Sequence, residues 1–146
     1  MELDLWSFDK VDLNSGTEDM PNNILRKQAD ILEEKTEKCI YGKVKNISIK
    51  SSLAKEETGY SIATKFELVV PALDNYTYTL FIMYSNPEKN YPLSITVGSA
   101  MEDDLENFNP NYECKNKEEF IDALRAILSS EAVKEVVKTL YTKASF

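Results

Sequence analysis

Cys39 and Cys114 carry the most nucleophilic side chains of this sequence, and no histidine accompanies them. Ser-His-Asp and Cys-His catalysis both need an imidazole, so the sequence excludes these mechanisms and lacks the commonest zinc ligand. Two cysteines alone are too few for a structural zinc site. We expect two free structural or surface thiols, and a redox pair or a disulfide is the alternative.

The loops that usually hold phosphate groups are missing as well. The four glycines are scattered, and none belongs to a GxxxxGK[ST] or GxGxxG pattern, so we do not expect ATP, GTP or dinucleotide binding through such loops. The pairs Glu33-Glu34 and Glu56-Glu57 are sequence neighbours. Neighbours on a helix do not face each other, which makes them poor general acid–base pairs. The sequence therefore indicates no cofactor.

A cluster of carboxylates lies in the segment Met101–Glu113. A calcium loop of the EF-hand type does not fit it, because Leu105 falls where an oxygen ligand is needed and no glycine allows the sharp turn. We expect a solvated acidic loop without a metal. Its carboxylates are candidates for contact with a partner: Glu102, Asp103, Asp104 and Glu106.

Several tyrosines follow one another in the middle of the sequence. Tyr76, Tyr78, Tyr84 and Tyr91 can line one face of a sheet. Tyrosine is favoured at protein interfaces, because its ring packs while its hydroxyl finds a partner. Strands also prefer aromatic residues, and a sheet covered by helices buries them. These four tyrosines are therefore candidates for partner binding, with burial in the core as the simpler alternative.

The elements that must position these residues form an α+β pattern. An uncharged run from Asn75 to Pro87 marks the middle of a sheet. Short turns between consecutive strands favour an antiparallel meander over parallel βαβ units. We expect an N-terminal helix at about 21–36 and a four-stranded antiparallel meander at 40–49, 62–70, 76–84 and 91–97. Two C-terminal helices within about 118–140, separated at Ser129-Ser130, pack on one face of the sheet.

Two strands deviate from simple alternation. In the first strand the apolar positions switch from even to odd around Lys45–Asn46, which suggests a β-bulge or a short break. The polar residues 51–59 end in Thr58-Gly59 and indicate a hairpin turn.

In the uncharged strand neither face is clearly polar. We expect its uncovered face to show Thr, Phe and Met, and such a surface could serve as a partner or dimer interface.

Composition limits the class of protein. The net charge is −8, from 25 acidic and 17 basic residues. Nucleic acids and anionic membranes are therefore unexpected partners. No apolar run approaches the roughly 20 residues of a membrane span, and no secretory signal is visible, so we expect a cytoplasmic protein. Residues 1–19 read as an acidic arm with a short edge strand near Leu3–Phe8, and residues 20–146 as one domain.

These features favour a small acidic, non-enzymatic protein that binds a protein partner with a basic surface, such as an inhibitor, an immunity protein or an adaptor. A small-molecule or peptide-binding domain that uses the aromatic sheet face, with Lys or Arg as an anchor, is the alternative. An enzyme that uses only carboxylates and tyrosine is the third hypothesis. Association of two copies through an exposed sheet face is compatible with the pattern.

The acidic loop generates a kinetic prediction. If its carboxylates steer a basic partner, neutralising Glu102, Asp103, Asp104 and Glu106 together lowers the association rate more than it raises the dissociation rate. Added salt also slows association, and thermal stability stays nearly unchanged because exposed charges contribute little to folding. Stopped-flow kinetics with the partner checks this. An association rate that ignores both salt and the fourfold neutralisation contradicts the steering role.

Overall fold

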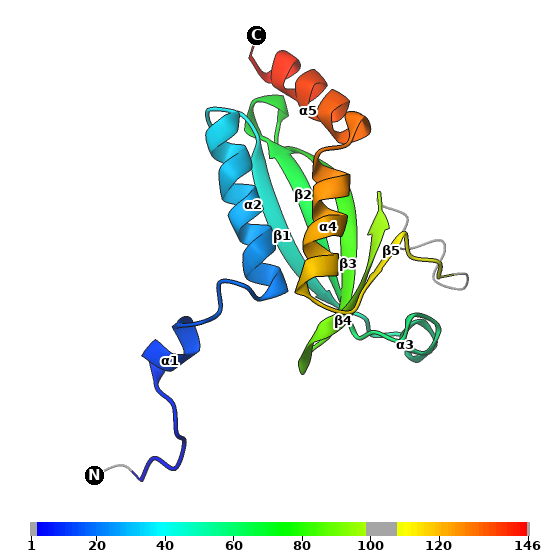
Figure 1. Ribbon diagram of the computed structural model, residues 1–146. Helices are drawn as coiled ribbons and strands as arrows, with labels where there is room; N and C mark the ends of the chain where they lie inside the picture. Colours follow the sequence, from blue (N-terminus) through cyan, green and yellow to red (C-terminus); the bar gives the residue numbers. More distant parts are fainter. Residues whose placement is uncertain (1–2, 99–107, 146) are drawn as a thin grey trace.

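A twisted antiparallel sheet organises the chain, and its longer helices lie on one face (Figure 1). The computed structural model describes residues 3–98 and 108–145. Its elements are α1 (Lys10–Asn14), α2 (Pro21–Lys35), β1 (Tyr41–Ser48), α3 (Ser52–Thr58), β2 (Ile62–Val70), the 3-10 helix η1 (Pro71–Leu73), β3 (Tyr76–Asn86), β4 (Lys89–Val97), β5 (Tyr112–Cys114), α4 (Lys117–Leu128) and α5 (Glu131–Ala144).

The sheet confirms the predicted α+β meander and extends it by one strand. The strand order is β1-β2-β3-β4-β5, and every neighbouring pair is antiparallel. The additional strand β5 pairs Cys114 with Leu93 and Tyr112 with Ile95. Sequence reasoning missed it because three residues are too few to show alternation, and they adjoin the segment predicted as an acidic loop.

Helices α2 and α4 cover the same face of the sheet, which we call the helix face (Figure 1). Pro21 occupies the first turn of α2 as predicted, where its missing N–H costs nothing. Asn116 Oδ1 accepts a hydrogen bond from Glu119 N at the start of α4, and Ser130 Oγ accepts one from Val133 N at the start of α5. Such caps satisfy backbone donors that a helix leaves free at its first turn.

A β-bulge lies in β3 rather than in β1. Phe66 of β2 is opposite Phe81, whereas the next residue, Glu67, is opposite Thr79, so Leu80 is the extra residue. An extra residue reverses which face the following side chains occupy. Leu80 and Phe81 therefore both pack on the helix face, and Phe81 stacks on Phe66 with ring centroids 5.2 Å apart. The predicted exposure of Phe and Met is wrong, because Phe81 and Met83 are fully buried.

The first strand runs without a bulge, contrary to the prediction. Its register with β2 is continuous from Tyr41 to Ser48. The apolar pattern switches because the second sheet face, the far face, is also covered at that end. There Ile49, Ala54 of α3, Ile82 and Tyr84 form a second buried cluster. Segment 51–59 is thus a helix instead of a hairpin turn, capped by Ser51 and ended by Gly59 in the left-handed conformation.

The two buried clusters divide the residues that the sequence suggests as core. Phe66, Leu68 and Leu80 lie in the cluster on the helix face, together with Leu124 of α4. Ile82 is equally buried but lies in the far-face cluster. Simple alternation along β3 predicts that Ile82 faces the helices, which is wrong. The bulge at Leu80 reverses the faces of the residues that follow it, and the residue types do not reveal this reversal.

The N-terminal arm, residues 3–16, projects away from the sheet (Figure 1). It contains α1 instead of the predicted edge strand, and Asp9 and Asp12 form a reciprocal capping box at its start. The chain joins the domain at the following residues. The side chain of Asn23 donates to Thr17 O, and Asp19 pairs with Lys117 at 3.1 Å.

Helix α2 approaches β1 closely at Gly42. A Cβ atom at this position would lie 2.6 Å from Ala29 Cβ, so we expect Gly42→Ala to destabilise the fold by about 1–3 kcal/mol through overpacking. This exceeds the roughly 0.4–1 kcal/mol that such a change gains by restricting the unfolded chain. Urea denaturation measures the effect.

The matched control for this contact is Ala29→Gly. It costs about 0.5–1 kcal/mol alone, as glycine does within a helix, and it relieves only part of the clash, because the Ala29 Cα atom would also lie 2.7 Å from the new Cβ atom. The double variant should therefore be more stable than the sum of the two single changes predicts. An unchanged urea midpoint for Gly42→Ala contradicts the close packing of α2 on β1.

Candidate functional site

An apolar groove lies on the helix face between α2 and α5, and we call it the α2–α5 groove. Its floor is formed by the sheet residues Phe66, Leu68 and Leu80, and its volume is about 330 Å³. Half-buried aliphatic side chains from both helices form its walls, and three exposed lysines stand among the lining residues. The remaining lining residues are Gln28, Ile31, Leu32, Lys35, Leu128, Ser129, Val133, Lys134, Val137 and Lys138.

The groove combines apolar and cationic surface. Lys35 comes from the last turn of α2, and Lys134 and Lys138 are one helical turn apart on α5. None of the described residues that line the groove is acidic. A protein with a net charge of −8 thus carries a locally cationic surface here. Its chemistry fits an apolar group with a carboxylate beside it.

The groove continues as a hollow between α2 and α4. That hollow has a volume of about 350 Å³ and shares Gln28, Leu128 and Ser129 with the groove. Arg125 also lines it, although its guanidinium is paired with Asp122 at 3.3 Å. The combined surface is elongated along α2. An elongated open surface suits a chain segment better than a compact small molecule, which proteins usually enclose.

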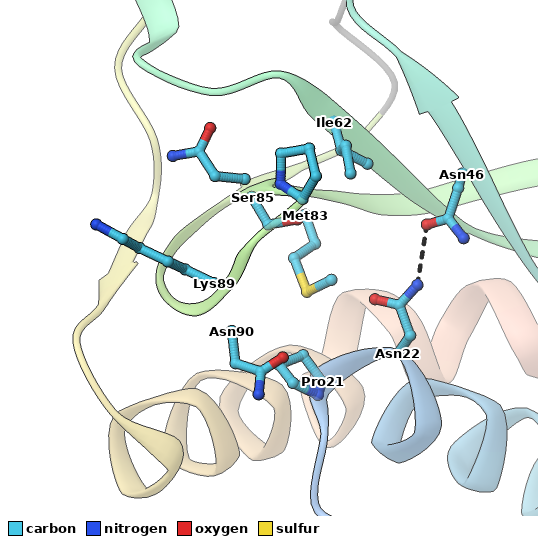
Figure 2. A pocket seen from close by; sticks show the side chains of 10 residues that line it. Pro21, Asn22, Asn46, Ile62, Met83, Ser85, Lys89 and Asn90 are labelled. Carbon is cyan, nitrogen blue, oxygen red and sulfur yellow. Dashed lines mark hydrogen bonds between the residues drawn. The ribbon is translucent and has the colours of Figure 1, made fainter. Parts of the chain in front are cut away.

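A second pocket lies at the opposite end of the sheet, beside the β3–β4 hairpin (Figure 2). It has a volume of about 300 Å³ and is lined mainly by polar side chains. Figure 2 shows Asn22, Asn46 and Asn90 around it, with the Met83 side chain between them. Amides of this kind can bind a polar ligand if their hydrogen-bonding groups are free.

Part of this polar lining is already used within the fold. Asn46 Oδ1 accepts hydrogen bonds from Asn22 Nδ2 at 3.0 Å and from Thr64 Oγ1 at 2.7 Å. These bonds hold the start of α2 against β1 and satisfy the buried Thr64 hydroxyl. Asn86 Nδ2 donates to Gly59 O at 3.4 Å. We therefore interpret this pocket as a structural junction and the α2–α5 groove as the candidate binding site.

The structure does not bring the four candidate tyrosines together. Tyr76 and Tyr78 are opposite Val70 and Leu68 on the helix face, with exposed fractions of 47% and 37%. Tyr91 packs on Phe120 near the other end of the sheet. Tyr84 is 1% exposed and belongs to the far-face cluster, so it presents no surface to a partner. Burial also raises its pKa.

The candidate carboxylates Glu102, Asp103, Asp104 and Glu106 lie outside the described residues. Their steering role therefore stays a prediction. Within 3–98 and 108–145, no group of three or more His, Cys, Asp or Glu side chains is arranged to hold a metal ion. Over the same ranges, no helix has the length and apolar character needed to cross a membrane.

The two cysteines are free, and Cys114 is buried on β5. Burial raises the pKa of the Cys114 thiol to about 11, and the nearby Glu119 carboxylate adds to the effect. The thiol is thus protonated at neutral pH, and a protonated thiol is a poor nucleophile. Cys114 therefore acts as a small apolar core residue.

Sequence reasoning missed the groove, and it did not select the apolar residues of the predicted arm as candidates for binding. The aliphatic residues of α5 predicted a stripe that packs on the sheet, but Val133 and Val137 are only half-buried. A signal was available in the arm, where six large apolar residues stand among carboxylates: Leu3, Leu5, Trp6, Phe8, Val11 and Leu13.

The hydroxyl groups of Tyr91 and Tyr60 allow a matched prediction. Among the described residues, the Tyr91 hydroxyl has no hydrogen-bond partner, whereas the Tyr60 hydroxyl lies 2.9 Å from Ser94 Oγ. Removing an unpaired hydroxyl relieves a desolvation cost, so Tyr91→Phe should leave the free energy of unfolding unchanged or raise it by up to about 1 kcal/mol. Tyr60→Phe should lower it by about 1–2 kcal/mol, because Ser94 then stays buried and unpaired. Urea denaturation compares them, and equal losses contradict the unpaired state of Tyr91.

Comparison with known proteins gave no match: no family model fits the chain, and no curated protein or solved structure is similar to it.

Proposed function

We propose that this chain is a non-enzymatic protein-binding domain, and that its α2–α5 groove binds an amphipathic segment of an acidic protein. The observation that carries the proposal is the combination of an apolar floor with three lysines and no acidic lining residue. This differs from the basic partner expected from the acidic loop. The steering of a basic partner by the acidic loop stays a separate prediction.

The half-buried walls of the groove supply most of the apolar surface that a ligand can still cover, and the floor fixes the shape of the groove. Phe66, Leu68 and Leu80 are almost fully buried and fixed by the sheet, so they lose little freedom when a ligand binds. The walls are half-buried aliphatic side chains such as Ile31, Val133 and Val137. A leucine or aromatic side chain that leaves water here contributes about 1.5–3 kcal/mol.

The lysines select the charge of the ligand. Lys35, Lys134 and Lys138 are exposed, so each pair that they form with a carboxylate contributes only about 0.2–1 kcal/mol. Their larger effect is on specificity, because a basic segment would meet three like charges. A helix with aliphatic residues on one face and carboxylates beside them satisfies both parts of the groove.

Two synthetic helical peptides test this proposal. One contains leucines on one face and glutamates on the other, and its control has lysines in place of the glutamates. Amide shifts of the isotope-labelled protein locate binding. The acidic peptide should perturb residues 28–35 and 128–138, and the basic peptide should not. No response to the acidic peptide in these segments contradicts the proposal.

Charge reversal sharpens the test. Lys134→Glu with Lys138→Glu should weaken binding of the acidic peptide by about tenfold or more, as the loss of two attractive pairs implies. The matched control is Lys43→Glu with Lys45→Glu, which changes the net charge equally on exposed positions of β1. The control should leave binding nearly unchanged. Equal losses in both variants indicate a net-charge effect and contradict a role of the groove.

A further inference from the structure

We infer that the acidic segment that occupies the α2–α5 groove is the N-terminal arm of a second copy of this chain, so that two copies exchange arms. This inference rests on the proposed binding role of the groove. It names the partner from three observations: the exposed apolar residues of the arm, its charge, and the direction in which it leaves the domain.

The arm exposes an unusual amount of apolar surface. Trp6 is 74% exposed, and Leu3 and Leu5 are 86% and 82% exposed. Phe8, Val11 and Leu13 are also exposed, at 44%, 73% and 59%. Contiguous apolar surface of this kind marks an interaction site in a folded protein. Tryptophan is also among the residues that most often anchor an interface.

The arm has local order of its own. The Trp6 and Phe8 rings pack against each other with centroids 5.6 Å apart. Asp4 Oδ1 accepts a hydrogen bond from Trp6 N, and the capping box of Asp9 and Asp12 starts α1. A segment that is already ordered loses less conformational entropy when it docks.

The charges of the arm and the groove are complementary. The described residues 3–14 carry three carboxylates, Asp4, Asp9 and Asp12, against the single cation Lys10. The groove offers Lys35, Lys134 and Lys138 around its apolar floor. The far face also carries lysines, such as Lys43 and Lys45, but they lack an adjoining apolar groove. Within residues 3–98 and 108–145, the α2–α5 groove combines an apolar lining with three lysines and no carboxylate, which complements the apolar and acidic surface of the arm.

The direction of the arm favours docking into the groove of a second copy over docking into the groove of its own domain. The arm leaves the domain at the N-terminal end of α2 and points away from it (Figure 1). The groove is lined by the C-terminal half of α2, from Gln28 to Lys35. Thr17 and Asp19 fix the chain at the start of α2 and α4. The arm thus lies away from the groove of its own domain and is free to reach another.

The volume of the groove agrees with the size of the side chains that the arm exposes. A groove of about 330 Å³ corresponds to roughly ten water molecules, which suits an anchor of one or two large side chains such as Trp6 and Leu5. In a reciprocal exchange the four rings of the two arms remove roughly 350–600 Å² from water, because Trp6 and Phe8 are 74% and 44% exposed before docking. The aliphatic residues of the arms bring the total toward the roughly 1,200 Å² of a specific interface. A reciprocal pair is closed and stops at two copies.

Trp6 is the only tryptophan of the chain, so its fluorescence reports the arm directly. The experiment measures molar mass by sedimentation equilibrium and Trp6 emission over the same protein concentrations. We expect the mass to rise from monomer to dimer while the emission shifts to shorter wavelength. A monomer with exposed Trp6 at all concentrations overturns the inference. So does a monomer with sheltered Trp6, which means that the arm folds onto its own groove, and so does a dimer in which Trp6 stays exposed.

A charge swap makes the test specific. The first variant combines Lys134→Glu with Lys138→Glu, so that its groove becomes acidic like its arm. The second combines Asp4→Lys with Ser7→Lys, so that its arm becomes basic like its groove. In a homodimer of either variant, like charges meet at both arm–groove contacts. Each should dissociate about tenfold or more readily than the natural chain. Mixed together they should form a heterodimer, because both contacts are then attractive. The chain with Lys43→Glu and Lys45→Glu is the matched control and should dimerise normally. Failure of the mixture to associate overturns the exchange.

The acidic synthetic peptide separates this inference from the proposed function. If the peptide binds residues 28–35 and 128–138 while the natural chain stays monomeric, the groove is a binding site but its partner is another protein. If neither the peptide nor the arm binds, both proposals fail.

Discussion

The extra residue in β3 is the constraint on which both buried clusters depend. At Leu80 the strand places two consecutive apolar side chains on the helix face. The following residues then alternate in the opposite sense, so that Phe81 and Met83 face the helices while Ile82 and Tyr84 face α3. Without the bulge, the two halves of β3 could not both bury their apolar residues. A single irregularity thus allows one strand to serve two cores.

The same residue shapes the candidate binding site. Leu80 adds to Phe66 and Leu68 in the floor of the α2–α5 groove. Helix α5 packs against η1, which connects β2 and β3 at the end of these strands, instead of covering this floor completely. Its half-buried valines and its lysines therefore line an open groove. The groove exists because the helices cover this part of the sheet incompletely, and its positive charge comes from the lysines of α2 and α5.

Much of the fold could be predicted from the residue types. Helices α2, α4 and α5 show helical spacing, α4 and α5 have capping side chains, α2 begins at Pro21, and β2 alternates cleanly. What failed has identifiable physical causes. Alternation assumes one covered face, so the coverage of the far face by α3 looked like a bulge in β1. The real bulge at Leu80 left no mark, because apolar residues stand on both sides of it. Strand β5 was too short to show a period.

The candidate site was less predictable than the fold. A groove arises from the spacing between α2 and α5, and a one-dimensional pattern does not contain that spacing. The aromatic residues chosen from the sequence were divided by the bulge, so that Tyr84 became core while Tyr76 and Tyr78 stayed half-exposed. The apolar residues of the arm were visible in the sequence. Their meaning depends on finding that no part of the domain covers them in the structure.

The position of β1 at the edge of the sheet has a consequence for how the protein behaves at high concentration. An edge strand offers unpaired backbone groups to any other strand, and long apolar edges seed aggregates. Lys43 and Lys45 are exposed along β1, between Gly42, Val44 and Ile47. Their charges oppose the stacking of one sheet on the edge of the next. The chain can thus leave an edge open and still avoid growing into fibrils.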